Sequence, residues 1–188
     1  MSTNTRCPWV GKLPIYIDYH DKEWGKPQFD EQKLFEKLCL EGQQAGLSWI
    51  TILKKRENYR NAFFQFEPEK VAQMTAEDID QCMQNPGLIR YRAKLEAIVK
   101  NAQAFLAMKK CGENFSDFIW SFVNHQPQMN DVPDLSVVPA QTPTSIEMSK
   151  ALKKRGFVFV GPTTCYAFMQ SMGLVNDHWN QCHCKSPD

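Results

Sequence analysis

Apolar residues recur at helical spacing along most of this 188-residue chain. The clearest run follows the turn at residues 85–87, where apolar positions advance by 3, 1, 3, 3 and 1 residues and predict one long amphipathic helix. Alternating, strand-like patterns are scarce, and the best of them spans only residues 157–160. The pattern therefore predicts an all-α fold. The apolar positions of the long helix are Leu95, Ile98, Val99, Ala102, Phe105 and Leu106.

Start and stop signals for helices divide the first part of the chain. Asp30 is a suitable N-cap for a helix that continues through Leu38 and breaks near Gly42 or Gly46. Ser48 can then start the next helix. These signals predict two helices joined by a short turn.

Two capping-box patterns follow. Thr75 and Asp78 resemble a box for a short helix that ends at the Asn-Pro-Gly turn of residues 85–87. Residues 144–147, Thr-Ser-Ile-Glu, form a second box for a helix that stops at Gly156.

The last part of the chain combines a long loop with one more helix. Four prolines between residues 126 and 143 mark an extended segment, which we expect to be a functional or mobile loop or to contain a short helix. The final helix stops at Gly173. Its inward-facing residues are predicted to be Cys165, Phe168, Met169 and Met172.

Glu41 occupies a helix position that normally carries a core residue. Leu34 and Leu38 precede it by seven and three positions, so the three side chains share one helix face. An isolated ionised carboxylate is strongly disfavoured away from water. Glu41 therefore needs a positive or hydrogen-bonding partner, which either the protein or a ligand supplies.

Composition narrows the class of protein. Hydrophobic residues make up 43% and charged residues 23% of the chain, which is ordinary for a globular protein, and the length suits one domain spanning residues 1–188. The apolar runs are too short to cross a membrane and the first residues lack the apolar stretch of a signal peptide, so a cytoplasmic protein is expected. A net charge of +1 provides no overall basic field, so any contact with nucleic acid must come from a local patch.

The seven cysteines indicate free thiols or metal ligands in a reducing compartment. Cys7 and His20 lie near one end of the chain, and His178 and Cys182 lie four residues apart near the other. Two thiolates and two imidazoles suit a closed tetrahedral zinc site, although on spacing alone surface thiols and imidazoles at the two termini are the commoner explanation. The competing candidates are His183 and Cys184.

Aromatic residues gather in sequence around the segment of Glu41. Most aromatic side chains serve packing, but several rings beside a carboxylate can also hold a flat cation through charge and cation-π attraction. A positively charged heterocycle fits that description. The residues of this aromatic cluster are Trp9, Tyr16, Tyr19, Trp24 and Trp49.

Residues 83–94 predict two helices that meet at a glycine-containing turn. Arg90, Arg92 and Lys94 lie where the second helix begins. Exposed backbone N–H groups at a helix start together with cations suit a phosphate, whereas a plain helical hairpin with solvated charges explains the pattern equally well.

Five motifs make the chain similar to a known family. They are Tyr-His-Asp-x-Glu-Trp-Gly at 19–25, Leu-Glu-Gly-Gln-Gln-Ala-Gly-Leu-Ser-Trp at 40–49, Leu-Lys-Lys-Arg-Glu-x-Tyr-Arg at 53–60, Trp-Ser-Phe-Val-Asn-His-Gln-Pro at 120–127 and Leu-Lys-Lys-Arg-Gly-Phe-x-Phe-Val-Gly at 152–161. Over nearly its whole length the chain closely resembles the 3-methyladenine DNA glycosylase I family, in the helix-hairpin-helix glycosylase superfamily.

The resemblance implies a helix-hairpin-helix fold and an enzyme that flips 3-methyladenine out of alkylated double-stranded DNA and releases it as the free base. No lysine is placed by motif as a Schiff-base nucleophile, which predicts a monofunctional enzyme without lyase activity, and we expect a monomer. One structural zinc ion is implied to tie the two ends of the chain together. The implied zinc ligands are Cys7, His20, His178 and Cys182; the catalytic and base-binding glutamate is Glu41; and the aromatic residues around the base are Tyr16, Tyr19 and Trp49, with Trp9 close by.

DNA contacts are expected at two turns, of which the first contains Gly46 and Leu47 and the second contains Gly87, Arg90 and Arg92. Leu47 is expected to wedge into the gap left by the flipped base. Two other hypotheses are a catalytically inactive relative that binds damaged DNA and a small zinc-dependent DNA-binding regulator. The intact Glu41, Tyr16 and Trp49 argue against the first hypothesis, and the second predicts sequence-specific binding to undamaged duplex.

Overall fold

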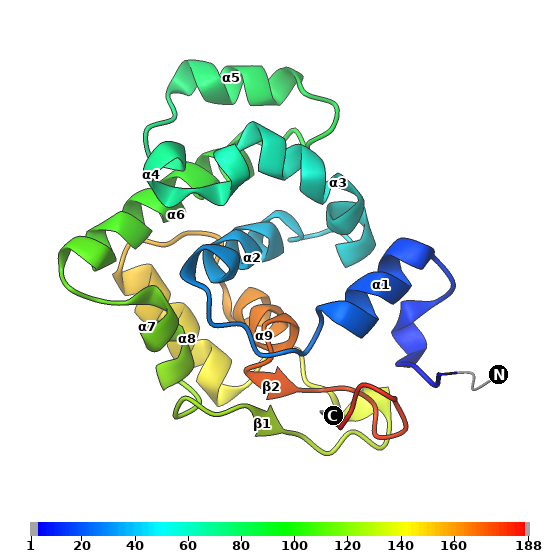
Figure 1. Cartoon of the computed structure of the whole chain (residues 1–188). Coiled ribbons are helices and arrows are strands. Elements are labelled where there is room, and N and C mark those ends of the chain that lie inside the picture. Colours follow the sequence, from blue (N-terminus) through cyan, green and yellow to red (C-terminus); the bar gives the residue numbers. More distant parts are fainter. Residues whose placement is uncertain (1–3, 187–188) are drawn as a thin grey trace.

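The computed structural model describes residues 4–186, and Figure 1 shows a set of helices with very little strand. This confirms the predicted helical fold. In chain order the α-helices are α1 (Pro14–Lys22), α2 (Glu31–Gln43), α3 (Trp49–Ala62), α4 (Pro68–Val71), α5 (Ala76–Gln84), α6 (Arg92–Lys110), α7 (Phe115–Ser121), α8 (Pro143–Lys154) and α9 (Pro162–Ser171). The short elements are the 3-10 helices η1 (Pro8–Val10), η2 (Phe64–Phe66) and η3 (Leu135–Val137) and the strands β1 (Gln128–Met129) and β2 (Val175–Asn176).

Helix α2 lies in the middle of the molecule and contacts α3, α6, α7 and α9 (Figure 1). It begins as predicted, because the Asp30 side chain accepts a hydrogen bond from the backbone N–H of Lys33. Leu34 and Leu38 are fully buried and Glu41 is 4% exposed. The predicted helix and its buried face are therefore confirmed, and the face brings a carboxylate into the protein interior.

The turn between α2 and α3 also lies where the sequence predicts it. Gly46 adopts a φ of +79°, a left-handed conformation that side chains with a Cβ rarely adopt. Ser48 precedes α3, but its hydroxyl bonds to the hydroxyl of Thr51 at 2.8 Å rather than capping the helix backbone. Leu47, at the tip of this turn, is 39% exposed.

Helices α5 and α6 are joined by a glycine-containing turn, as predicted. Both hydrogen bonds of the Thr75 and Asp78 capping box are present, and α5 ends at Gln84 with Asn85 as its C-cap. Gly87 sits in the connecting turn, where an added Cβ would come within 2.8 Å of the Asn58 side chain. The turn is thus held closely against α3, because Asn58 also donates a hydrogen bond to the carbonyl oxygen of Gly87 at 3.1 Å.

The cap of α8 differs from the prediction. The box is formed by Thr142 and Ser145, two residues before the predicted one, with the Ser145 N–H donating to the Thr142 hydroxyl at 3.1 Å. Pro143 occupies the first helical position, which proline favours because its missing N–H would have no helical partner there. The end of this helix near Gly156 and the end of α9 near Gly173 agree with the predictions.

The strand pattern at residues 157–160 does not form a strand. Phe159 has a φ of +56°, which breaks an extended conformation. The segment is held instead by the Asn101 side chain, which bonds to both the N–H and the carbonyl oxygen of Val158. The strands that do form, β1 and β2, are two residues each and pair in parallel, far apart in sequence. The loop at 126–143 contains β1 and the short helix η3, in agreement with one of the expectations for it.

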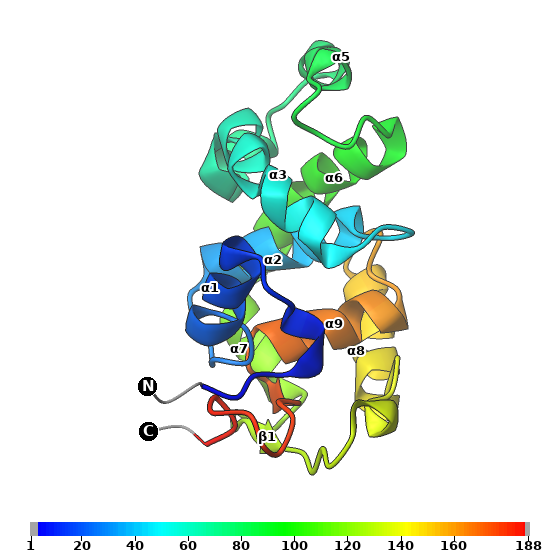
Figure 2. The same cartoon turned by 90° about the vertical axis from the view of Figure 1, so that its right-hand side faces the viewer.

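The buried apolar side chains bring the two halves of the chain together, since one cluster includes residues from every α-helix, α1 to α9. The two ends of the described chain lie side by side (Figure 2), with the N–H of His183 donating to the carbonyl oxygen of Thr5 at 2.9 Å. Within residues 4–186, no helix is both long and apolar enough to cross a membrane.

Candidate functional site

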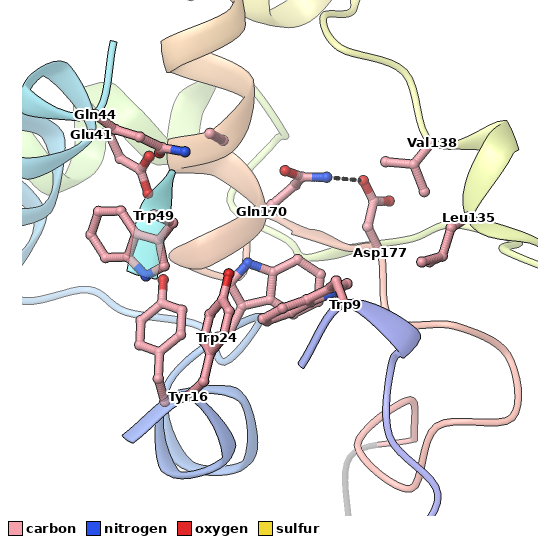
Figure 3. A pocket seen from close by; sticks show the side chains of 12 residues that line it. Trp9, Tyr16, Trp24, Glu41, Gln44, Trp49, Leu135, Val138, Gln170 and Asp177 are labelled. Carbon is pink, nitrogen blue, oxygen red and sulfur yellow. Dashed lines mark hydrogen bonds between the residues drawn. The ribbon is translucent and has the colours of Figure 1, made fainter. Parts of the chain in front are cut away.

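A cavity of about 380 Å³ opens between α1, the end of α2, the start of α3, α9 and the η3 loop. Figure 3 shows the side chains that surround it. The cavity brings together all the sequence-predicted base-contacting residues. Its lining comprises Trp9, Tyr16, Tyr19, Trp24, Glu41, Gln44, Trp49, Leu135, Val138, Ala167, Gln170 and Asp177.

Aromatic rings form one continuous wall of the cavity. Trp9 lies 5.1 Å from Tyr16 and 5.0 Å from Trp24 between ring centroids, and Tyr19 lies 5.5 Å from Trp49. The buried indole N–H of Trp49 has no hydrogen-bond partner among residues 4–186. Because unpaired buried donors are costly, this N–H suits an acceptor atom on a ligand.

Glu41 has a partner inside the protein that the sequence reasoning missed. The ammonium of Lys37, one helical turn earlier, lies 3.3 Å from the Glu41 carboxylate, and both residues are about 5% exposed or less. Burial raises the pKa of Glu41, while Lys37 opposes that rise. Burial also lowers the pKa of Lys37, to about 8, against the raising effect of Glu41. The i and i+4 spacing of an acid and a base on one helix face was the available signal.

Besides the aromatic wall, the cavity has a polar wall, which is formed by α9 and the residue that follows β2. Asp177 accepts a hydrogen bond from the Gln170 amide at 3.0 Å (Figure 3). It also accepts hydrogen bonds from the Asn130 amide at 2.7 Å and from the hydroxyl of Tyr166. Leu135 and Val138, from the loop around η3, lie beyond Asp177. No short motif links these residues to Glu41, so only the folded chain reveals that they share a cavity.

Four buried residues could hold a metal ion beside this cavity. The candidate ligand atoms of Cys7, His20, His178 and Cys182 all lie within 4.8 Å of one another. His178 Nδ1 lies 3.5 Å from the Cys7 sulfur and 3.6 Å from the Cys182 sulfur, and His20 Nε2 lies 3.4 Å from the Cys182 sulfur. The structure thus brings the predicted set together from opposite ends of the chain. His183 and Cys184, the competing candidates, are more exposed and form overlapping groups with Cys182 or His20.

The neighbours of the two histidines suit ligands of a metal. His20 Nδ1 lies 2.7 Å from the Asp21 carboxylate, and His178 Nε2 lies 3.1 Å from the carbonyl oxygen of Trp24. Metal-binding histidines commonly donate their second ring N–H to such acceptors. Burial lowers the pKa of His178 to about 4, which favours the neutral imidazole that a metal requires. Although burial alone would raise it, bonds from Arg6 and His20 lower the pKa of Asp21 to about 2.

The predicted phosphate-binding residues of the hairpin differ in their surroundings. Arg90 is exposed and forms no ion pair among residues 4–186. Arg92 is paired with Asp80 and lies 3.6 Å from Glu96. Lys94 is buried, contrary to the sequence reading, and its ammonium donates to the carbonyl oxygens of Gln43 and Ala45 at the end of α2. Of these three cations, Arg90 is the one that solvent reaches without a competing carboxylate.

A buried carboxylate in an aromatic pocket suits the binding of a flat cationic ring, and comparison with known proteins identifies the class as a DNA glycosylase. The family model for methyladenine glycosylase matches residues 9–185. A protein of Haemophilus influenzae named DNA-3-methyladenine glycosylase is 78% identical over 182 residues, covering 97% of this chain and 98% of the relative. The chain belongs to the methyladenine glycosylase family, and the resemblance predicted from its motifs is confirmed.

Solved structures agree with this assignment. A crystal structure of 3-methyladenine DNA glycosylase I has a TM-score of 0.95 at 58% identity, covering 96% of this chain and 99% of that chain. A crystal structure of a tyrosine-to-phenylalanine variant of 3-methyladenine DNA glycosylase I, in complex with 3-methyladenine, has a TM-score of 0.93 at 45% identity, covering 97% and 98% of the two chains.

Proposed function

We propose that this chain excises 3-methyladenine from alkylated double-stranded DNA and releases the free base, acting as a monofunctional base-excision repair glycosylase. The observation that carries this proposal is the buried Glu41 carboxylate at the wall of an aromatic cavity of about 380 Å³. That volume lies within the range of roughly 300–1,000 Å³ typical of ligand pockets. Family membership supports the same reaction.

The reaction begins with extrusion of the damaged nucleotide, because a base inside the duplex cannot reach the pocket. Methylation at N3 gives the adenine ring a delocalised positive charge. The aromatic wall then stacks against the flat base, and Glu41 accepts a hydrogen bond from its exocyclic amine. Neutral adenine gains less from a carboxylate and also pairs normally in the duplex, so it is excluded at both stages.

Hydrolysis requires little help once the base is bound. Water attacks C1′ of the sugar, the bond from C1′ to the base breaks, and its electron pair leaves with the base, which becomes neutral 3-methyladenine. The attacking water loses one proton to solvent and leaves a hydroxyl group on C1′. No lysine is needed as a nucleophile. The ammonium of Lys37, beside the pocket residue Glu41, is engaged with that carboxylate at 3.3 Å and with the Tyr19 hydroxyl at 2.5 Å, which supports a mechanism without a Schiff base or lyase step.

We also propose that Cys7, His20, His178 and Cys182 bind one structural zinc ion. For tetrahedral zinc with Zn–S of about 2.3 Å and Zn–N of about 2.0 Å, sulfur and nitrogen ligands lie about 3.5 Å apart. The three sulfur-to-nitrogen distances of 3.4 to 3.6 Å fit that geometry. Backbone N–H groups of Trp179 and Cys184 also point to the two sulfurs, as suits thiolates. Four protein ligands leave no position for a catalytic water, so the ion would join the chain ends rather than take part in hydrolysis.

DNA is proposed to approach the turn that contains Gly46 and Leu47 and the helix-hairpin-helix turn that contains Gly87, Arg90 and Arg92. The exposure of Leu47 supports its role as a wedge, and the exposed Arg90 supports a phosphate contact. Since Arg92 already has two carboxylate partners, we assign the larger phosphate contribution to Arg90. The shared core of α1 to α9 supports a single domain, and we propose that it acts as a monomer.

The decisive experiment measures the bases released from methylated DNA by the wild-type chain and by Glu41→Gln. The amide keeps the shape of the side chain but loses its charge, so release of 3-methyladenine should fall about ten- to a hundredfold, as expected for a lost hydrogen bond to a charged group. Folding and non-specific DNA binding should remain. Wild-type release and wild-type affinity for free 3-methyladenine in a stable Glu41→Gln protein would contradict the proposal.

A gel-shift comparison of methylated and plain duplex separates the remaining hypotheses. A regulator would bind a specific undamaged sequence, and an inactive relative would bind methylated DNA without releasing a base. The proposed enzyme instead binds plain duplex weakly and without sequence preference, and releases 3-methyladenine from methylated DNA.

A further inference from the structure

We propose that Lys37 is a positioning residue for the base pocket, which holds the Glu41 carboxylate and the Tyr19 and Trp49 side chains in one arrangement. The inference rests on the proposed function and deepens it, because it identifies what prepares Glu41 to recognise the base. Lys37 does not line the pocket itself, and it lies on the side of α2 that borders a separate charged recess.

A single ammonium group makes three contacts to residues that do line the pocket. Lys37 Nζ lies 3.3 Å from a carboxylate oxygen of Glu41, 2.5 Å from the hydroxyl oxygen of Tyr19 and 3.4 Å from the centroid of the Trp49 ring. Those three residues come from α2, α1 and α3 respectively. Lys37 is 5% exposed, so water does not compete strongly for its hydrogen bonds. The ammonium therefore fixes the relative positions of three helices where they form the pocket wall.

The contact with Trp49 restricts how a base can stack. An aromatic ring has two faces, and an ammonium 3.4 Å from the centroid occupies one of them. A flat base can therefore meet only the opposite face or the edge of this indole. The ammonium also draws on the negative potential of the ring, which weakens the attraction that Trp49 offers to a second cation. Discrimination in favour of a cationic base consequently depends more on Glu41 than on stacking against Trp49.

The charge of Lys37 also favours the ionised form of Glu41. Burial raises the pKa of Glu41 and the nearby ammonium opposes this rise, so without the ammonium the carboxylate would be protonated at a higher pH. Protonated Glu41 would lose the charge that favours the cationic base. The other titratable or polar groups that act on the pair are Tyr16 and Tyr19 from α1, Glu23 just after α1, Arg56 from α3 and Ser171 from α9.

The test compares Lys37→Met with Lys33→Met, a matched substitution of an exposed lysine on the same helix. Thermal unfolding shows whether each variant folds. Affinity for free 3-methyladenine and release of 3-methyladenine from methylated DNA are then measured between pH 5 and 9. For Lys37→Met we expect an affinity loss of about ten- to a hundredfold at pH 7, the range for a lost charge-assisted interaction, and no loss for Lys33→Met.

The dependence of base affinity on pH distinguishes a positioning role of Lys37 from a loss of stability, because a loss of stability alone would not shift the acidic limb of this profile. Binding requires ionised Glu41, so affinity falls as the pH falls through its pKa, and this acidic limb should lie at higher pH in Lys37→Met than in the wild type. In a Glu41→Gln background, Lys37→Met should reduce the affinity by a smaller factor than in the wild type, because only the contacts with Tyr19 and Trp49 remain to be lost. An unshifted limb, or the same loss in both backgrounds, would overturn the proposal.

If Lys37→Met does not fold, the affinity profile against pH is measured with Lys37→Gln instead, and its acidic limb should likewise lie at higher pH than in the wild type. This variant keeps a hydrogen-bond donor but removes the charge. The wild-type control separates the two proposals. A folded wild-type chain that releases no 3-methyladenine would refute the proposed function, whereas an active wild type with an equally active Lys37→Met would refute the role of Lys37 alone.

Discussion

Gly25→Ala should disturb the proposed zinc site through one close contact. Gly25 has a φ of +78°, and an added Cβ would lie 2.8 Å from Nε2 and 3.0 Å from Cδ2 of His178. Ordinary carbon contacts begin near 3.4 Å, so the imidazole or the glycine backbone must move by about half an ångström. Contacts on both sides of the His178 ring oppose this movement. Its Nε2 lies 3.1 Å from the carbonyl oxygen of Trp24, and its Nδ1 faces the sulfur atoms of Cys7 and Cys182.

The matched control is Gly112→Ala, since Gly112 has a similar φ of +82° but no heavy atom within 4 Å of the added Cβ. Both substitutions carry the cost of a left-handed alanine, about 1–2 kcal/mol. Gly25→Ala adds the loss of the His178 hydrogen bond, about 1 kcal/mol, and misplaces a ligand by more than the roughly 0.2 Å that metal bond lengths tolerate. At about 2–4 °C for each kcal/mol, the control should lose about 2–8 °C in Tm and Gly25→Ala several degrees more.

The assay combines thermal unfolding with zinc content after dialysis against a competing chelator. Gly112→Ala should retain the metal of the wild type, whereas Gly25→Ala should lose it at chelator concentrations about tenfold to a hundredfold lower, the usual effect of disturbing the partner of a metal-binding histidine. Equal Tm values and equal zinc content in the two variants would refute the reasoning, because the contact with His178 would then carry no consequence.

The remaining predictions concern the metal and the DNA contact. Cys182→Ser should lower the Tm while the folded fraction retains its rate of 3-methyladenine release, and a rate loss greater than the loss of folded protein would show that the cluster takes part in the chemistry. Arg90→Ala should weaken DNA binding on all sequences and reduce the slope of log affinity against log salt by about 0.9, as expected for one lost phosphate contact, whereas Lys110→Ala, at the far end of α6, should leave the slope unchanged. An unchanged slope for Arg90→Ala would exclude Arg90 as a phosphate contact.

The sequence predicted those features whose signals are local. Asp30 caps α2 and Thr75 with Asp78 caps α5, because the side chain and the backbone groups that it bonds are three residues apart. The two-residue strands were missed, since their pairing joins residues 128 and 175 and neither strand is long enough to show a pattern. The cap of α8 was misplaced by two residues, although Pro143 offered a local signal for the helix start.

The candidate site was predicted only in part for the same reason. Glu41, the aromatic cluster and the four possible metal ligands are recognisable by residue type and motif, and the fold brings them together. Gln170 and Asp177 reach the cavity from distant segments, and nothing in their local sequence indicates it. Lys37, in contrast to Gln170 and Asp177, has a local signal, because it precedes Glu41 by one helical turn. The sequence therefore contains enough information to identify Lys37 as the partner of the buried carboxylate.

Lys94 shows why residue type alone misassigns cations near a DNA-binding turn. Its position after Arg90 and Arg92 suggested a third phosphate contact, but its ammonium instead bonds to the carbonyl oxygen of Gln43 at 3.0 Å and to that of Ala45. Carbonyl groups at the end of a helix lack helical partners and carry partial negative charge, so a buried ammonium is well matched to them. The amide of Gln43 donates in return to the carbonyl oxygen of Lys94 at 2.8 Å. These reciprocal bonds fix the start of α6 against the turn that carries Leu47, so the two segments proposed to meet DNA are held at one spacing, and a substitution of Lys94 would disturb that spacing rather than remove a single phosphate contact.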